Sequence, residues 1–128
     1  MGENRVLTVI VARPGPLREG IEALLASVAQ VEIVGKSEFG SSALSIAAEC
    51  RVDLLLLDAG LPADAVMSVL HACRRRRPKL RCIALADNAA QEQAARDLGA
   101  DAVFLKGYPA AQFVETVEGL LSSLTHDD

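Results

Sequence analysis

An aspartate and a lysine end two different apolar runs of the chain. Asp58 closes the four leucines of RVDLLLLDAGLP, and Pro62 follows it by four residues. A carboxylate at that place is either a reactive group or a cap for the following turn. Lys106 ends the later run DAVFLK, and a carboxylate and an ammonium at two strand ends of one sheet can form a half-buried ion pair. Whether the two groups meet depends on the elements that carry them.

Five apolar runs rich in branched residues predict five strands, at 6–11, 31–34, 53–57, 82–86 and 102–105. These strands alternate with segments of helical apolar spacing, and they are apolar on both faces. A parallel sheet covered on each side has this pattern, because each crossover carries its helix over the sheet. The sequence therefore predicts an α/β fold, a doubly wound (βα)5 domain. Helices are expected around 17–28, 41–51, 66–73, 89–98 and 113–124.

Local signals mark the ends of these helices. Asn88 and Ser41 are candidate N-caps, because their side chains can accept a hydrogen bond from the first helical turn. Gly99 is expected to end a helix in the left-handed conformation. Helices could begin at Pro16, Pro62 and Pro109, since the first helical position needs no amide donor.

The size of the chain predicts one domain. A length of 128 residues, 51% of them apolar, is about what one compact core needs. No repeat or linker interrupts the sequence before the terminal THDD. We expect a single domain over residues 1–128, with a core at about 5–124 and a tail at 125–128.

Charge and composition exclude several classes of protein. Six of the thirteen basic residues lie between Arg74 and Arg81, and the rest of the chain carries seven basic against seventeen acidic residues. Such an acidic body argues against direct nucleic-acid binding, and the basic patch is interpreted as solvated residues near a helix C-terminus. No run is apolar enough for export or a membrane span, so a cytoplasmic protein is expected. Cys50, Cys73 and Cys82 lack metal-ligand spacing and are interpreted as reduced core thiols, and no metal site is expected.

Four stretches follow one another along the chain: PLREGIEALL, VEIVGKSEFGSSAL, VDLLLLDAGLP and LGADAVFLKG. Together they resemble the receiver domain of two-component response regulators, most closely the LuxR/NarL-like subfamily of transcriptional regulators. The resemblance implies a flavodoxin-like fold with strand order 2-1-3-4-5. It also implies that Asp58 is the position that accepts a phosphoryl group from a histidine kinase. Lys106 matches the lysine that contacts this phosphoryl group.

Three positions depart from the pattern of such receivers. Two acidic residues usually end the first strand and hold Mg²⁺, whereas this chain has Ala12 and Arg13 there. The hydroxyl residue that ends the fourth strand aligns with Ala86, and the aromatic switch residue of the fifth aligns with Val103. The resemblance therefore implies a degenerate active site, that of a pseudo-receiver.

The missing acids bear on metal binding. Mg²⁺ requires several hard oxygen ligands, and Asp58 alone is a poor set. A guanidinium about 4 Å from a dication would repel it by roughly 8 kcal/mol at an effective dielectric of about 20. We hypothesise that Arg13 occupies the place of the metal and, with Lys106, pairs with Asp58; the alternative is an Arg13 that points to solvent. Magnesium binding is expected to be weak or absent, with no other cofactor, and Asp87 is assigned a helix-start role.

These features favour a non-enzymatic signalling module. It would be the receiver domain of a LuxR/NarL-type regulator and act through protein contacts, without Mg²⁺-dependent phosphorylation. Its partners would be a histidine kinase, another signalling protein or a second copy of itself. Two alternatives stay open: a working phosphoacceptor modified on Asp58, and a small-ligand-binding domain of the same fold.

Overall fold

The computed structural model describes residues 5–38, 51–76 and 79–125. Its strands form one parallel sheet in the predicted order β2-β1-β3-β4-β5. The strands are β1 (Val6–Val11), β2 (Val31–Ser37), β3 (Leu54–Asp58), β4 (Arg81–Ala86) and β5 (Ala102–Leu105), and the helices are α1 (Pro16–Ala26), α3 (Ala63–Arg76), α4 (Ala89–Asp97) and α5 (Ala110–Thr125). The helix expected at 41–51 and its cap Ser41 lie outside the described residues, apart from Arg51.

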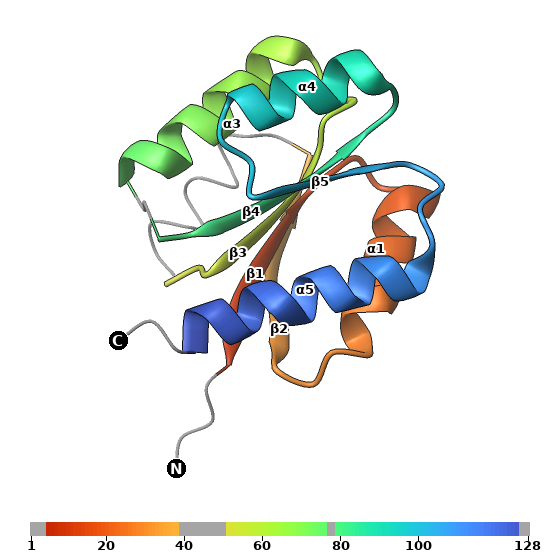
Figure 1. The fold of residues 1–128 in the computed structure, drawn as a ribbon, viewed down its shortest axis with the longest axis vertical. Helices are drawn as coiled ribbons and strands as arrows, with labels where there is room; N and C mark the ends of the chain where they lie inside the picture. Colours follow the sequence, from red (N-terminus) through yellow and green to blue (C-terminus); the bar gives the residue numbers. More distant parts are fainter. Residues whose placement is uncertain (1–4, 39–50, 77–78, 126–128) are drawn as a thin grey trace.

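Helices cover both faces of the sheet. Figure 1 shows α3 and α4 on one side and α1 and α5 on the other. Alternate residues of β3 serve the two sides: Leu55 and Leu57 pack in the cluster with α3, and Leu54 and Leu56 pack in the cluster with α1 and α5. All four leucines are at most 1% exposed, which explains why the strand is apolar at every position.

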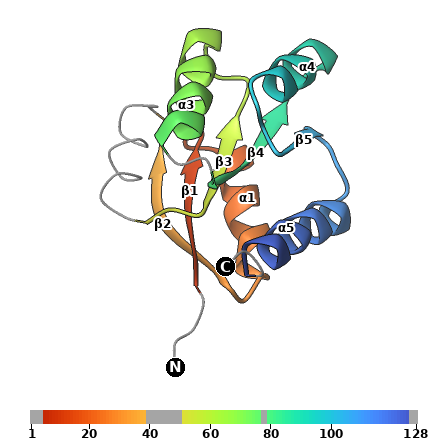
Figure 2. The same cartoon turned by 60° about the vertical axis from the view of Figure 1, so that its left-hand side comes forward.

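The parallel arrangement brings the strand ends together. The arrowheads of β1, β3 and β4 point to the same edge of the sheet (Figure 2). Backbone hydrogen bonds continue the ladder past the ends of the strands: Ala59 N donates to Leu85 O at 2.8 Å, and Lys106 N donates to Ala86 O at 2.9 Å. Residues that follow β3, β4 and β5 therefore meet at one place.

The predicted helix signals act as expected. Pro16 is the first residue of α1, and Asn88 Oδ1 accepts a hydrogen bond from Gln91 N at 2.9 Å. Gly99 has a φ of 100° and ends α4. Pro62 and Pro109 each precede a helix by one residue, where their carbonyls accept the hydrogen bonds of Val66 N and Phe113 N.

One basic residue of the predicted solvated patch is instead tied to the fold. Arg74 Nη2 donates to Leu80 O at 2.8 Å and to Asp101 Oδ2 at 3.0 Å. The same carboxylate oxygen accepts the amide of Cys82 at 2.7 Å. Arg74 therefore fastens the end of α3 to β4 and β5, because the start of each strand presents polar groups that α3 can reach.

Two of the cysteines lie in the core, as predicted. Cys73 and Cys82 are free thiols, and burial raises the pKa of each above its ordinary value. Such thiols are poor nucleophiles, because the thiolate is the reactive form. Cys50 lies outside the described residues. Among the helices of the described ranges, none is long and apolar enough to cross a membrane.

The central strand should dominate stability. Leu56 is fully buried, and Leu56→Ala should lower the free energy of unfolding by about 3 kcal/mol, since the cavity adds to the lost apolar burial. Met67, which is 52% exposed on α3, provides the matched control. Met67→Ala should change the free energy of unfolding by less than about 0.5 kcal/mol in urea denaturation. Equal losses in the two variants would contradict this packing.

Candidate functional site

Asp58 is the last residue of β3, and its side chain is only 12% exposed. Its Oδ1 accepts a hydrogen bond from the amide of Gly60 at 2.8 Å and one from Lys106 Nζ at 2.8 Å. The aspartate thus both caps its own turn and forms an ion pair across the sheet. The predicted cap of the following turn and the predicted ion pair with Lys106 are therefore both present.

Lys106 lies immediately after β5 and binds two carboxylates at once. Besides the contact with Asp58, its Nζ lies 2.7 Å from Asp87 Oδ1. The helix-start role predicted for the Asp87 carboxylate is therefore wrong: Asn88 caps α4, and Asp87 reaches back toward the sheet. Its position after β4 was visible in the sequence, but the direction of its side chain was not.

The contacts at Lys106 shift the pKa of the lysine and that of Asp87. Partial burial lowers the pKa of Lys106, but hydrogen bonds and charge from Asp58 and Asp87 outweigh it, so its pKa is raised above 10.5. The hydrogen bond from Lys106 lowers the pKa of Asp87 below 3.8. The Lys106 contribution to stability is therefore lost as pH rises through its folded-state pKa, and the Asp87 contribution as pH falls through its own.

Ala12 and Arg13 follow β1 at the same edge of the sheet. Ala12 is 1% exposed and offers only a methyl group, while its backbone carbonyl accepts a hydrogen bond from Arg18 Nη1 at 3.2 Å. Arg13 is exposed and pairs with no acidic group among the described residues. The hypothesis that Arg13 pairs with Asp58 is therefore wrong, and the solvent-facing alternative is correct. Exposure keeps the guanidinium hydrated, and Lys106 already supplies the cation.

The positions aligned with the hydroxyl and the aromatic switch residue lie in one small apolar cluster. Ala86 is fully buried, Val103 is 8% exposed, and both belong to a cluster completed by Ala59, Ala84 and Ala95 of α4. The cluster lacks a hydroxyl that could bind an anion and an aromatic ring that could change rotamer. It holds α4 against β4 and β5 by simple apolar contact.

The donor set at this edge does not fit Mg²⁺. The facing oxygens of Asp58 and Asp87 are both held by the Lys106 ammonium, and the neighbouring Ala12 side chain carries no oxygen. Within the described ranges, no three His, Cys, Asp or Glu side chains gather as a metal site would require. A dication at this edge would compete with the ammonium for both carboxylates and would find no further side-chain oxygen at Ala12.

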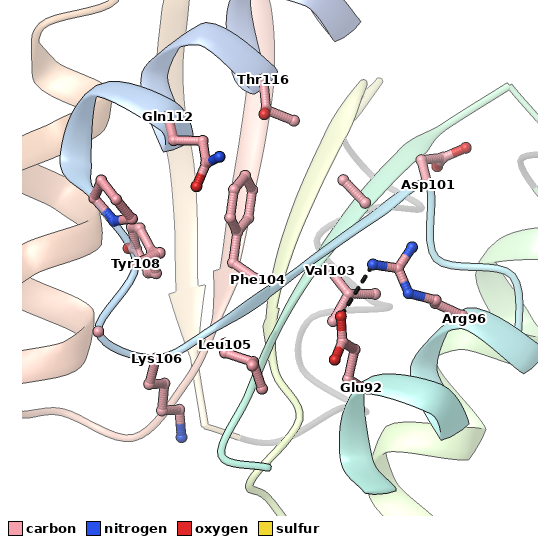
Figure 3. Close-up of a pocket in the computed structure, with 13 residues that line it drawn as sticks. Glu92, Arg96, Asp101, Val103, Phe104, Leu105, Lys106, Tyr108, Gln112 and Thr116 are labelled. Atoms are coloured by element: carbon pink, nitrogen blue, oxygen red, sulfur yellow. Dashed lines mark hydrogen bonds and ion pairs between the residues drawn. The ribbon is translucent and has the colours of Figure 1, made fainter. Parts of the chain in front are cut away.

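A groove of about 550 Å³ runs along β5 from the site (Figure 3). Glu92 and Arg96 of α4 border one side, and Gln112 and Thr116 of α5 border the other. Leu105, 43% exposed, lies on its floor. Near the Lys106 end, three aromatic rings pack with centroids 5.3 to 5.5 Å apart: Phe104, Tyr108 and Phe113.

Comparisons with known proteins agree with this architecture. The chain is 24% identical over 120 residues to the transcriptional regulatory protein DegU of Brevibacillus brevis, covering 92% of this chain and 51% of DegU. The receiver domain of the response regulator NarL of Mycobacterium tuberculosis is 25% identical, with a TM-score of 0.78 and coverage of 91% and 96% of the two chains. The isolated REC domain of Salmonella RcsB is 22% identical, with a TM-score of 0.79 and coverage of 93% and 90%.

The chain has the flavodoxin-like fold of response-regulator receiver domains. Both DegU and NarL match along almost its whole length. No protein-family model matches it. The receiver spans about half the length of DegU. The RcsB domain was solved with the phosphomimetic BeF₃⁻, and the structural likeness to it supports the fold assignment.

The ion pair between Asp87 and Lys106 can be tested by titration. The Asp87 carboxyl carbon, followed by NMR, should titrate below 3.8, and Lys106→Met should raise its midpoint, because the variant removes the hydrogen bond and the positive charge. Lys36→Met is the control, since Lys36 pairs with Glu22 at 3.4 Å. An Asp87 midpoint that is the same in wild type and Lys106→Met would show that the pair does not form in solution.

Proposed function

We propose that this receiver is the regulatory domain of a NarL/LuxR-type transcriptional regulator and acts through protein contacts, without Mg²⁺-dependent phosphorylation of Asp58. The observation that carries the proposal is the state of the Asp58 carboxylate. Its Oδ1 is bound by Lys106 Nζ and by the Gly60 amide, both at 2.8 Å. A nucleophilic carboxylate needs the metal to neutralise the charge of the incoming phosphoryl group, and the neighbouring residues do not supply the ligands.

The packing between α4, β4 and β5 also supports a constitutive interaction with a protein partner. The buried cluster of Ala86 and Val103 offers no two-state side chain that an event at Asp58 would reset. The face formed by α4, β5 and α5 therefore keeps one arrangement, and a partner binds it constitutively. The partner is a signalling protein, such as a histidine kinase, or a second copy of the chain. RcsB provides a precedent for the larger assembly, since its dimers have been described bound to DNA.

Phosphorylation can be tested directly. Wild-type receiver incubated with acetyl phosphate and Mg²⁺ should show no phosphoryl adduct in its intact mass, because the donor set does not hold the metal. Isothermal titration of the wild type with Mg²⁺ alone should show no saturable heat.

Asp58→Asn is the control for the site of any modification. It keeps the size of the side chain and removes the nucleophilic carboxylate. An adduct present in the wild type and absent in Asp58→Asn would overturn the proposal and make the chain a working phosphoacceptor. An adduct of equal size in both proteins would lie elsewhere and would leave the proposal standing.

A further inference from the structure

The carboxylate of Asp87 is a second partner of the Lys106 ammonium, beside Asp58. The two Nζ to Oδ1 distances are 2.7 Å for Asp87 and 2.8 Å for Asp58. The backbone of Asp87 is held as well, since its amide donates to Gln91 Oε1 at 2.7 Å. The carboxylate therefore projects from a fixed point between β4 and α4.

Gly60 makes room for this arrangement. A Cβ at position 60 would lie 2.6 Å from Asp87 Oδ2, and 3.0 Å from both Asp58 Oδ1 and Lys106 Nζ. Real Cβ atoms do not approach an oxygen to 2.6 Å, so any larger residue would displace the Asp87 carboxylate. The φ of Gly60 is not in the left-handed region. The need for glycine is therefore a matter of space around the three charged groups.

We propose that Asp87 is a built-in anion that occupies Lys106 and excludes external tetrahedral anions from the Asp58 site, and that Gly60 admits it. An ammonium has three donors, and two of them already point at carboxylates. A phosphate or phosphoryl group near Lys106 would lie beside the Asp87 charge and be repelled by it. This role of Asp87 deepens the function proposed above. It rests on that function because it assumes that Lys106 lies where the phosphoryl group of an ordinary receiver would be bound.

Asp87 also adds a polar connection to the apolar contacts between α4, β4 and β5. It lies between β4 and the N-cap Asn88 of α4, and its salt bridge reaches the turn after β5. Withdrawal of this carboxylate would free one donor of the ammonium. A movement of the α4 N-terminus would carry the carboxylate away from Lys106. The anion site at Lys106 is thus closed by the residue that precedes the N-cap of α4 and opened by the removal of its carboxylate.

Phosphate binding tests the proposal. Inorganic phosphate is titrated into ¹⁵N-labelled wild type and Asp87→Ala, and the backbone amides of Gly60 and Lys106 are followed by NMR. Asp87→Ala should bind phosphate at least about tenfold more tightly than wild type, because an ammonium donor is freed and a repelling charge is lost. Asp87→Asn should change the affinity in the same direction, since it removes only the charge.

Three further variants separate a local effect from a change in net charge. Asp97→Ala removes the same charge from the other end of α4, where Asp97 accepts a hydrogen bond from Gln93 at 2.8 Å. It should bind phosphate as wild type does. Adding Lys106→Met to Asp87→Ala should abolish the gain. Gly60→Ala should reproduce the gain of Asp87→Ala, because it displaces the carboxylate without removing it.

Equal phosphate affinities in wild type and Asp87→Ala would overturn the inference. So would an equal gain in Asp97→Ala, or a gain that survives Lys106→Met. These outcomes are independent of the acetyl phosphate experiment. A wild-type adduct on Asp58 refutes the proposed function, whereas an unchanged phosphate affinity in Asp87→Ala refutes the role of Asp87 alone.

Discussion

A parallel sheet covered on both faces can present polar groups only where its strands end. The side chains of β3 are buried on both sides, so its first available polar position is Asp58. The same constraint delivers Asp87 after β4 and Lys106 after β5 to one edge. The chemistry of the domain is therefore confined to a few residues, and Ala12 and Arg13 at the end of β1 add no carboxylate to them.

At that edge a fixed side chain offsets part of the negative charge. One ammonium contacts two carboxylates, and the Gly60 amide also donates a hydrogen bond to Asp58. A buried carboxylate needs such compensation, because an unpaired charge would cost several kcal/mol. The protein supplies it with fixed side chains. A lysine side chain is always present at the site, whereas a dication offsets negative charge only when it is bound.

Much of the fold could be predicted from the sequence. The apolar runs are local patterns that mark the strands, and the resemblance to receivers supplied their order. Apolar runs gave β1 and β5 with their observed bounds, and the strand order followed from the resemblance to receivers. The strand predicted at 31–34 is longer in the structure. β2 continues to Ser37 because its backbone goes on pairing with β1 after the apolar residues end, past a register shift between Thr8 and Val9.

The candidate site was predictable in its positions and less so in its contacts. The pair of Asp58 and Lys106 follows from topology, since they lie at the same edge of the sheet, at the ends of the two strands that flank β4. The directions of Arg13 and Asp87 depend on rotamers and on free space, which no local pattern encodes. Gly60 is the clearest case: it matters because it has no Cβ, and two of the three groups that a Cβ would meet belong to Asp87 and Lys106, far away in the sequence.

The packing of the aromatic rings near Lys106 has a practical consequence. Tyr108 is the single tyrosine of a chain without tryptophan, and it lies two residues beyond Lys106, stacked on Phe113 at 5.3 Å. Its phenol has a pKa raised by burial, so it stays protonated at neutral pH. The ultraviolet emission of the whole chain therefore originates from the turn between β5 and α5. The fluorescence of Tyr108 is therefore an intrinsic probe of the region around Lys106.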